Sequence, residues 1–152
     1  MKIVPTRRTD YGIRALIYLA NEAPNQANAT EIATAMGIPK DFLHQVLQDL
    51  IRAGLVRSRP GRGGGYALVP SADAVTILEI VEALEGPLNQ SECALRGGPC
   101  HWEDVCALHS VWSAARQALI DRLSEGTLQQ IADDDRALQE GRMKIPADSH
   151  RR

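Results

Sequence analysis

Residues 30–68 read TEIATAMGIPKDFLHQVLQDLIRAGLVRSRPGRGGGYAL, and this stretch decides the fold. Its first part predicts a short helix that Thr30 caps and that ends at Met36, followed by a glycine-containing turn at 37–39. A longer helix is expected over 40–53, with Gly54 placed to end it. Short helix, turn and longer helix form a helix-turn-helix. Apolar residues recur at helical spacing, so we expect the longer helix to bury Phe42, Leu43, Val46, Leu47, Leu50 and Ile51.

The residues that follow predict a β-hairpin. Residues 55–59 favour a strand, the glycine-rich segment 60–65 favours a turn, and 66–68 favour the returning strand. Arg57, Arg59 and Arg62 can reach phosphate or a minor groove, and the glycines let the backbone approach DNA closely. A basic hairpin directly after a helix-turn-helix is typical of the wing of a DNA-binding domain. A packing module whose glycines serve only the turn is the alternative.

The outward side chains of the helix over 40–53 are the candidates for reading bases. His44 and Gln45 lie in its N-terminal half, which normally meets base edges, and glutamine can bond adenine through two hydrogen bonds. An ordinary solvated helix face is the alternative. The expected DNA contacts are Lys40, His44, Gln45, Gln48, Arg57, Arg59, Arg62 and Tyr66.

Charge is divided unevenly along the 152 residues. The net charge is −2, but residues 1–70 hold nine basic and five acidic side chains, so the remainder is acidic. This asymmetry indicates that only the N-terminal part meets a polyanion. No apolar signal region opens the sequence, and no run approaches the roughly 18 apolar residues of a membrane span, so we expect a cytoplasmic protein without a membrane partner.

Helices are expected on both sides of the DNA-binding unit. An apolar face predicts an opening helix that starts near residues 7–9 and runs to about residue 22. Thr76 with Glu79 forms a capping box for a helix that runs to 84–85. A long helix is expected from about Val105 to Ser124, and a short one after Thr127. The apolar stripe of the long helix is too long for one small domain to cover, which favours a dimerisation helix over an intramolecular core. The stripe consists of Leu108, Trp112, Ala115, Leu119 and Leu123.

Together these elements predict a mainly α fold with a small β-hairpin wing. It comprises a winged helix-turn-helix DNA-binding domain and a long C-terminal dimerisation helix. The expected division is 1–70 for the winged helix-turn-helix domain, 71–90 for a connecting helix, 91–110 for a cysteine loop, 105–135 for the dimerisation helix and a final short helix, and 141–152 for a disordered tail.

All three cysteines fall in one polar, glycine-rich loop. Cys93, Cys100 and Cys106 have six and then five residues between them, and His109 follows three positions after the last. We expect Cys106 in the first turn of the long helix, where the helix dipole favours the thiolate, with His109 on the same helix face. The clustering favours metal or redox chemistry over buried apolar thiols, and an odd number without a secretion signal argues against a disulfide framework.

With these pieces placed, residues 6–133 resemble the IscR, NsrR and RirA family of bacterial winged-helix regulators, the Rrf-two (Rrf2) family. The resemblance rests on TDYGIRAL at 9–16, AGLV at 53–56, GGGY at 63–66, the three cysteines, Trp112 and the Thr-Leu pair at 127–128. It implies a homodimeric transcription factor whose cysteines hold an iron–sulfur cluster and whose affinity for DNA follows the state of that cluster. The expected DNA is a double-stranded operator with an inverted repeat.

The resemblance leaves the fourth cluster ligand open. His109 matches the ligand position of IscR-like members, which hold a two-iron cluster, and an imidazole ligand generally raises the cluster potential. Asp10 matches the position from which NsrR-like members supply a carboxylate from the partner subunit to a four-iron cluster. We prefer His109 with a two-iron two-sulfur cluster over a four-iron four-sulfur one, because local geometry fixes its distance from Cys106. The alternative for Asp10 is that it is an acid in the first turn of a helix, favoured there by the helix dipole. The alternative for His109 is that it is an ordinary residue on a helix face.

Two departures from the family bear on the DNA sequence that is read. The chain has Arg59-Pro60-Gly61 where the family's wing usually has Val-Arg-Gly, so Arg59 or Arg62 must replace the groove-reading arginine. His44 stands where IscR-like proteins have glutamate. We therefore expect a different target sequence.

The cysteine loop is expected to lie between the wing domain and the dimerisation helix, so that a change in the cluster repositions one recognition helix relative to its partner. Half-sites one helical turn apart tolerate little error. Loss, oxidation or nitrosylation of the cluster would then release repression, and the signal is nitric oxide, iron or cluster supply, or redox state. The alternative is a regulator with a Cys3His zinc site or a thiol redox switch. An enzyme is not expected, because no orienting group accompanies a cysteine nucleophile.

Overall fold

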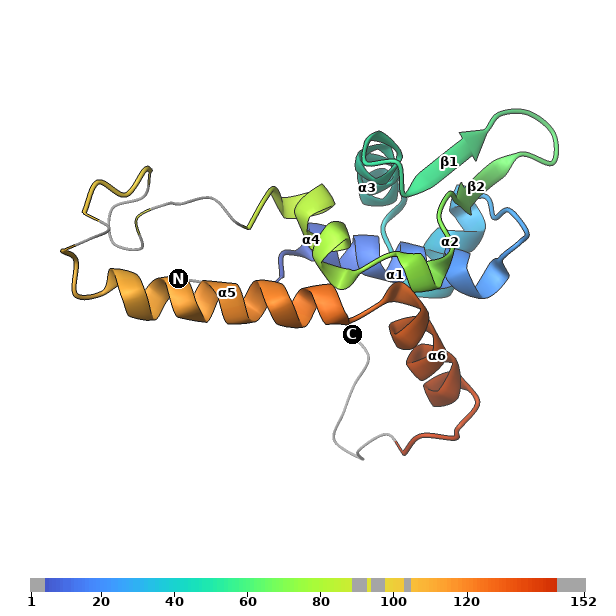
Figure 1. Cartoon of the computed structure of the whole chain (residues 1–152). Helices are drawn as coiled ribbons and strands as arrows, with labels where there is room; N and C mark the ends of the chain where they lie inside the picture. The colour runs from blue at the N-terminus through green and yellow to red at the C-terminus, as the bar shows by residue number, and fades with distance from the viewer. Residues whose placement is uncertain (1–4, 89–92, 94–97, 103–104, 145–152) are drawn as a thin grey trace.

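A computed structural model describes residues 5–88, 93, 98–102 and 105–144 of the chain (Figure 1). Helices dominate this part of the chain, and two strands form one antiparallel hairpin. The elements in chain order are α1 (Arg7–Glu22), α2 (Ala29–Met36), α3 (Lys40–Arg52), β1 (Val56–Arg59), β2 (Gly65–Leu68), a single 3₁₀ turn η1 (Ala72–Ala74), α4 (Ile77–Glu85), α5 (His109–Glu125) and α6 (Leu128–Gln139).

The helix-turn-helix forms as the sequence predicts, apart from its first cap. Asn28, not Thr30, caps α2: its side-chain oxygen accepts hydrogen bonds from the backbone nitrogens of Thr30 and Glu31, at 2.9 and 3.0 Å. The Glu31 carboxylate accepts in return from the Asn28 backbone nitrogen at 2.7 Å. Asparagine followed three residues later by glutamate is a capping box, and it moves the cap and the helix start two residues earlier than predicted. Gly54 ends α3 with a left-handed φ of 75°, as expected.

The core lies between α1, α2, α3 and α4, with α6 covering α1. Leu43, Val46, Leu47 and Leu50 of α3 are fully buried in it, which the helical spacing predicts. The prediction that Phe42 is buried is wrong, because its side chain is 42% exposed. Its ring packs edge-on against the ring of Tyr11, with the ring centroids 5.6 Å apart. Its position in the first turn of α3 places it at the edge of the core.

The hairpin is joined to the helices by an additional backbone pair. β1 and β2 pair from Val56 with Leu68 to Arg59 with Gly65. Ala27 donates to the carbonyl oxygen of Tyr66 at 3.0 Å and accepts from the Tyr66 nitrogen at 2.8 Å. A Cβ atom at position 65 would lie 2.7 Å from the Ala27 carbonyl oxygen, so only glycine allows this close approach.

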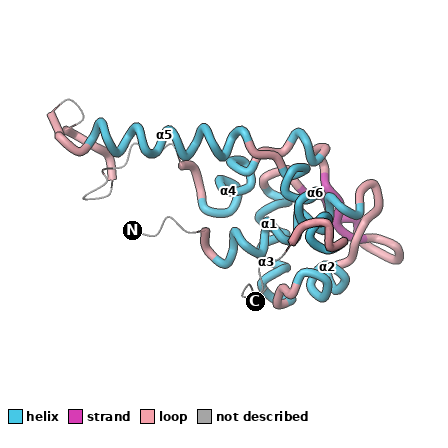
Figure 2. The backbone as a smooth tube through the Cα atoms, turned by 90° about the horizontal axis from the view of Figure 1, so that it is seen from below, coloured by secondary structure: helices cyan, strands magenta, loops and turns pink. Residues whose placement is uncertain are grey.

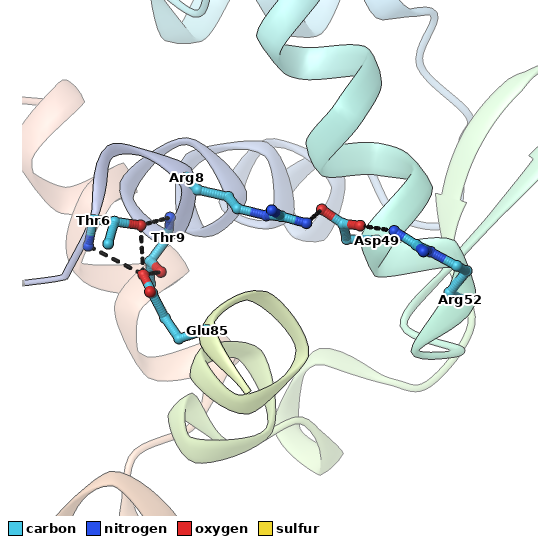
Figure 3. Close-up of polar contacts among 6 residues, drawn as sticks. All are labelled: Thr6, Arg8, Thr9, Asp49, Arg52 and Glu85. Atoms are coloured by element: carbon cyan, nitrogen blue, oxygen red, sulfur yellow. Dashed lines mark hydrogen bonds and ion pairs between the residues drawn. The ribbon is translucent and has the colours of Figure 1, made fainter. Parts of the chain in front are cut away.

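Polar contacts hold the first turn of α1 to two other helices (Figure 3). Glu85, the last residue of α4, accepts hydrogen bonds from the Thr6 nitrogen at 3.1 Å and from the hydroxyl groups of Thr6 and Thr9. Burial raises the pKa of the Glu85 carboxyl, but the hydrogen bonds from Thr6 and Thr9 outweigh it and the pKa lies below its ordinary value. This contribution to stability is therefore present at neutral pH and is lost as pH falls through that lowered pKa.

A buried carboxylate connects α1 to α3 on the same side. The Asp49 side chain is only 4% exposed and forms ion pairs with both Arg8 and Arg52. A buried carboxylate is costly unless it is paired, and two guanidinium groups provide that pairing here. The position of α3 relative to α1 is thereby fixed by polar contacts as well as by the core.

The long helix α5 projects away from the core and places two parts of the molecule at opposite ends. In Figure 1 the hairpin lies at one end, and the described residues of the cysteine loop lie at the far tip of α5; Figure 2 shows the same separation. The expected position of the loop between wing and dimerisation helix holds along the chain but not in space, because α5 carries the loop away from its own wing. Among the described helices, none is long and apolar enough to cross a membrane.

Candidate DNA-reading surface and cysteine site

One face of α3 is buried and the other is free to meet DNA. The predicted base-reading side chains of this helix are all exposed: Lys40, His44, Gln45 and Gln48. Because Leu43, Val46, Leu47 and Leu50 anchor the opposite face in the core, these polar side chains are carried on a rigid support. The arrangement fits a recognition helix that enters a major groove by its N-terminal half.

The hairpin presents its three arginines to solvent. Arg57, Arg59 and Arg62 are exposed, and none of the ion pairs formed within the described residues involves them. The tip is tightly folded: a Cβ atom at Gly64 would lie 2.0 Å from the carbonyl oxygen of Arg59. The guanidinium groups are therefore held on a compact basic tip, available for phosphate or for a groove.

Tyr66 differs from the other expected DNA contacts. It is half-buried, packs against the core and uses its backbone to pair with Ala27. A contact of the Tyr66 hydroxyl group with DNA stays a prediction. In the structure, Tyr66 connects the hairpin to Ala27 and to the core.

The cysteine site is built at the start of α5. Leu108 is the N-cap of this helix and His109 is its first residue, four positions later than expected from the sequence. Cys106 is therefore not in the first turn, and it does not share a helix face with His109. Its backbone nitrogen instead donates to the Trp102 carbonyl at 2.8 Å, and its carbonyl accepts from the His109 nitrogen at 3.0 Å, so Cys106 lies in the turns that precede α5.

His109 contacts a different cysteine from the one expected. Its Nδ1 atom lies 3.7 Å from the Cys100 sulfur, and its Nε2 atom lies 3.2 Å from the Ser113 hydroxyl oxygen. Two ligands of one tetrahedral metal, a thiolate at about 2.3 Å and an imidazole nitrogen at about 2.0 Å, lie about 3.5 Å apart. The Cys100–His109 separation is close to that value.

The remaining thiols are half-buried in the same loop but are not gathered with this pair. Cys93 donates its backbone nitrogen to the Gly98 carbonyl at 2.7 Å. Within the parts of the chain that the structure describes, no three Cys, His, Asp or Glu side chains lie close enough to hold a metal ion. Two of the predicted ligands, Cys100 and His109, thus lie together, while Cys106 lies between them in the chain and Cys93 precedes them.

Asp10, the alternative fourth ligand, lies on α1. Its carboxylate forms an ion pair with Arg14 at 2.9 Å and lines an open pocket of about 430 Å³ at the start of the helix. Pro5, Thr6, Arg7 and Ile13 complete the lining. Asp10 is half-buried and its pocket is open, so a group from another molecule can approach this carboxylate.

The comparisons with known proteins agree on one family. The Rrf2 model, described as an iron-dependent transcriptional regulator, matches residues 5–134. The chain belongs to the Rrf2 family. An rrf2-like HTH-type transcriptional regulator of Rhodobacter capsulatus is 38% identical over 117 residues, covering 71% of this chain and 78% of that protein. Protein aau3 of Rhizobium meliloti is 33% identical over 83% of this Rrf2 chain and 82% of its own length.

Solved structures show the same fold. CymR, the global cysteine regulator of B. subtilis, matches with a TM-score of 0.71 and 30% identity, over 88% of this Rrf2 chain and 97% of that one. IscR of T. potens matches with a TM-score of 0.70 and 24% identity, over 96% of this chain and 94% of that one. The predicted mainly helical fold with a β-hairpin wing is confirmed. This Rrf2 protein is a DNA-binding transcriptional regulator and not an enzyme.

Sequence reasoning missed one residue of the cysteine site. Ser113 lies one helical turn after His109 and contacts its ring, but serine in a polar helix carries no signal of its own. The spacing of four residues from a candidate ligand could have pointed to it, because side chains four apart on a helix are neighbours.

Proposed function

We propose that this Rrf2 protein is a homodimeric repressor whose affinity for an inverted-repeat operator depends on an iron–sulfur cluster. The proposed cluster ligands are Cys93, Cys100, Cys106 and His109. The observation that carries the proposal is the Cys100–His109 pair, in which a thiol sulfur and a ring nitrogen lie 3.7 Å apart in the loop that holds every cysteine of the chain.

The donor chemistry of the loop fits a cluster. Thiolate sulfur and imidazole nitrogen are the ligands that iron–sulfur clusters take from proteins. All three thiols are half-buried, which is consistent with a site that is shielded but reachable by small oxidants or nitric oxide. A bound cluster would supply a redox-active and nitric oxide-sensitive centre in this loop. The chain's own contribution is to hold the ligands at the tip of the long helix α5.

The described geometry favours His109 over Asp10 as the fourth ligand. His109 already lies against a cysteine of its own chain, whereas Asp10 is engaged by Arg14 and would have to reach a loop of the partner subunit. His109 goes with a two-iron two-sulfur cluster, and Asp10 with a four-iron four-sulfur one. The open pocket beside Asp10 keeps the second arrangement as the alternative.

Dimer formation through α5 is supported by its exposed apolar side. No residue of α5 is buried, although Val111, Ala115 and Leu119 lie on one side of the helix. Val111 is 66% exposed and Leu119 is 39% exposed. A second copy would cover this side and would bring two α3 helices onto two half-sites.

A zinc site or a thiol switch at the same loop is the second candidate. A tetrahedral zinc site uses the same four ligands, and the separation of sulfur and nitrogen fits its bond lengths equally well. CymR, a solved structure similar to this chain, is the global cysteine regulator of B. subtilis, which supports a thiol-based signal as an alternative to a cluster. The metal content of the purified protein separates the two candidates.

The test is the iron and sulfide content, with the ultraviolet–visible spectrum, of protein purified without oxygen. We expect brown wild-type protein with about two irons and two sulfides per chain, because His109 completes a two-iron site. His109→Ala should lose most of its iron, whereas Asp10→Ala should retain it. The matched controls are His101→Ala in the same loop and Asp73→Ala on η1, both exposed side chains.

The other outcomes each overturn a part of the proposal. About four irons per chain that are lost in Asp10→Ala would contradict His109 and establish the partner carboxylate. Colourless protein with one zinc per chain would replace the cluster by the zinc site. Colourless protein that binds neither iron nor zinc after reconstitution would contradict any metal site in the cysteine loop.

A further inference from the structure

Both ring nitrogens of His109 are engaged, and by different elements. Nδ1 faces the Cys100 sulfur of the loop at 3.7 Å, and Nε2 faces the Ser113 hydroxyl oxygen of α5 at 3.2 Å. The helix fixes the second contact, because Ser113 lies one turn after His109 on the same side. Ser113 belongs to the same helix as His109, whereas Cys100 belongs to the loop that precedes the helix.

This arrangement decides which nitrogen is available to a metal. A histidine ligand binds through a nitrogen without a proton, so the proton stays on the other nitrogen and is donated to an acceptor. The Ser113 oxygen is such an acceptor and is placed at Nε2. The nitrogen that remains, Nδ1, points at the thiol.

We propose that Ser113 is a positioning residue that makes Nδ1 of His109 the metal-facing nitrogen of the cysteine site. This inference rests on the proposed function, since it assigns a supporting role to a residue behind a proposed ligand. Without Ser113 the ring loses the contact that orients it, and either nitrogen can turn toward the loop. Partners of this kind typically contribute about 10- to 100-fold to metal affinity.

Zinc is a suitable probe, because it is diamagnetic and takes the same sulfur and nitrogen ligands. Protein labelled with ¹⁵N in its imidazole rings is titrated with Zn²⁺ alone, and the ring nitrogens of His109 are followed by long-range ¹⁵N–¹H spectra. In the wild type we expect Nδ1 to bind zinc and Nε2 to keep a slowly exchanging proton. In Ser113→Ala we expect zinc affinity to fall at least about tenfold and the Nε2 proton to exchange rapidly.

Two further variants separate positioning from a merely structural role. Ser113→Thr keeps a hydroxyl group at the same position and should retain wild-type affinity and slow exchange. Ser110→Ala removes an exposed hydroxyl next to His109 and should leave both unchanged. Alanine is at least as favourable as serine in a helix, so Ser113→Ala should keep its thermal stability.

The outcomes distinguish this inference from the proposed function. Wild-type protein that binds zinc through Nε2, or Ser113→Ala that binds zinc as the wild type does, would overturn the inference and leave the metal site standing. Wild-type protein that takes up neither zinc nor iron and sulfide in this loop would overturn the proposed function and the inference with it.

Discussion

Replacing Leu119 with glutamate is expected to split the protein into monomers and to lower its operator affinity roughly 10²- to 10⁴-fold. Leu119 is 39% exposed on α5, a helix in which no residue is buried by the rest of the chain. In a dimer packed through this side, the new carboxylate would be buried without a partner, which costs several kcal/mol at least. A monomer binds only one half-site, so it loses the gain in affinity that comes when two linked recognition helices bind two half-sites together.

Gln117→Glu is the matched control for this change. It introduces the same side chain on the same helix, but position 117 lies on nearly the opposite side from position 119. Gln117 is exposed and bonds Asp121 at 2.7 Å, so the variant adds only a like-charge pair of a few tenths of a kcal/mol. Analytical ultracentrifugation and operator titration should show a dimer for this variant and a monomer for Leu119→Glu. A dimer in both would place the subunit interface elsewhere.

The second large effect is expected at the recognition helix. Gln45→Ala should weaken binding to the preferred operator by about 1–3 kcal/mol at each half-site, which is about 2–6 kcal/mol for a symmetric dimer. Gln45 is exposed in the N-terminal half of α3, the part that reaches base edges in this class of domain. The loss should be confined to the preferred sequence, so discrimination at one base pair of each half-site should relax.

Arg57→Ala provides the contrast, because Arg57 is exposed on the hairpin and a phosphate contact carries no sequence information. It should weaken binding to all DNA sequences alike and lower the slope of affinity against salt by about one per arginine removed. Selection from random DNA, followed by titration at several salt concentrations, measures both variants. A Gln45→Ala protein that keeps every base preference of the wild type would contradict its assignment as a base-reading residue.

Most of the fold could be predicted because its signals are local. Helix α1 has the predicted bounds, and the Thr76 and Thr127 capping boxes start α4 and α6 as expected. The errors also have local causes. Asn28 and Thr30 are both good caps, and only the reciprocal bond from Glu31 decides between them. Phe42 has the spacing of a core residue, but the first turn of α3 lies at the edge of the core.

The candidate site was less predictable, because it depends on where a helix begins and on how a loop lies in space. The periodicity of the long helix extends back to Val105, but α5 begins only at His109. Cys106 therefore lies before the helix and not in it, and the cysteine beside His109 is Cys100. The separation of loop and wing follows from the direction of α5, which no residue pattern encodes. The expected tail at 141–152 lies outside the described residues from 145 onward.

The distance between the cysteine loop and the hairpin shapes the proposed mechanism. A change in the loop reaches its own recognition helix only through α5 and α4 or through the partner subunit. The start of α4 is tied to the α5–α6 junction, where Ile77 donates to the Gly126 carbonyl at 2.9 Å and Leu128 donates to the Val75 carbonyl at 2.8 Å. The end of α4 holds α1 through Glu85. We therefore expect the loop to act on the relative placement of the two α3 helices.

The measurement that tests the central claim most directly is the affinity of one operator for the same protein with and without its cluster. Operator DNA selected by the loaded wild type is titrated, without oxygen, with loaded protein and with protein from which iron has been removed. The account predicts binding about 5- to 150-fold tighter for the loaded form, the usual range for coupling between two sites. Equal affinities of the two forms would contradict it.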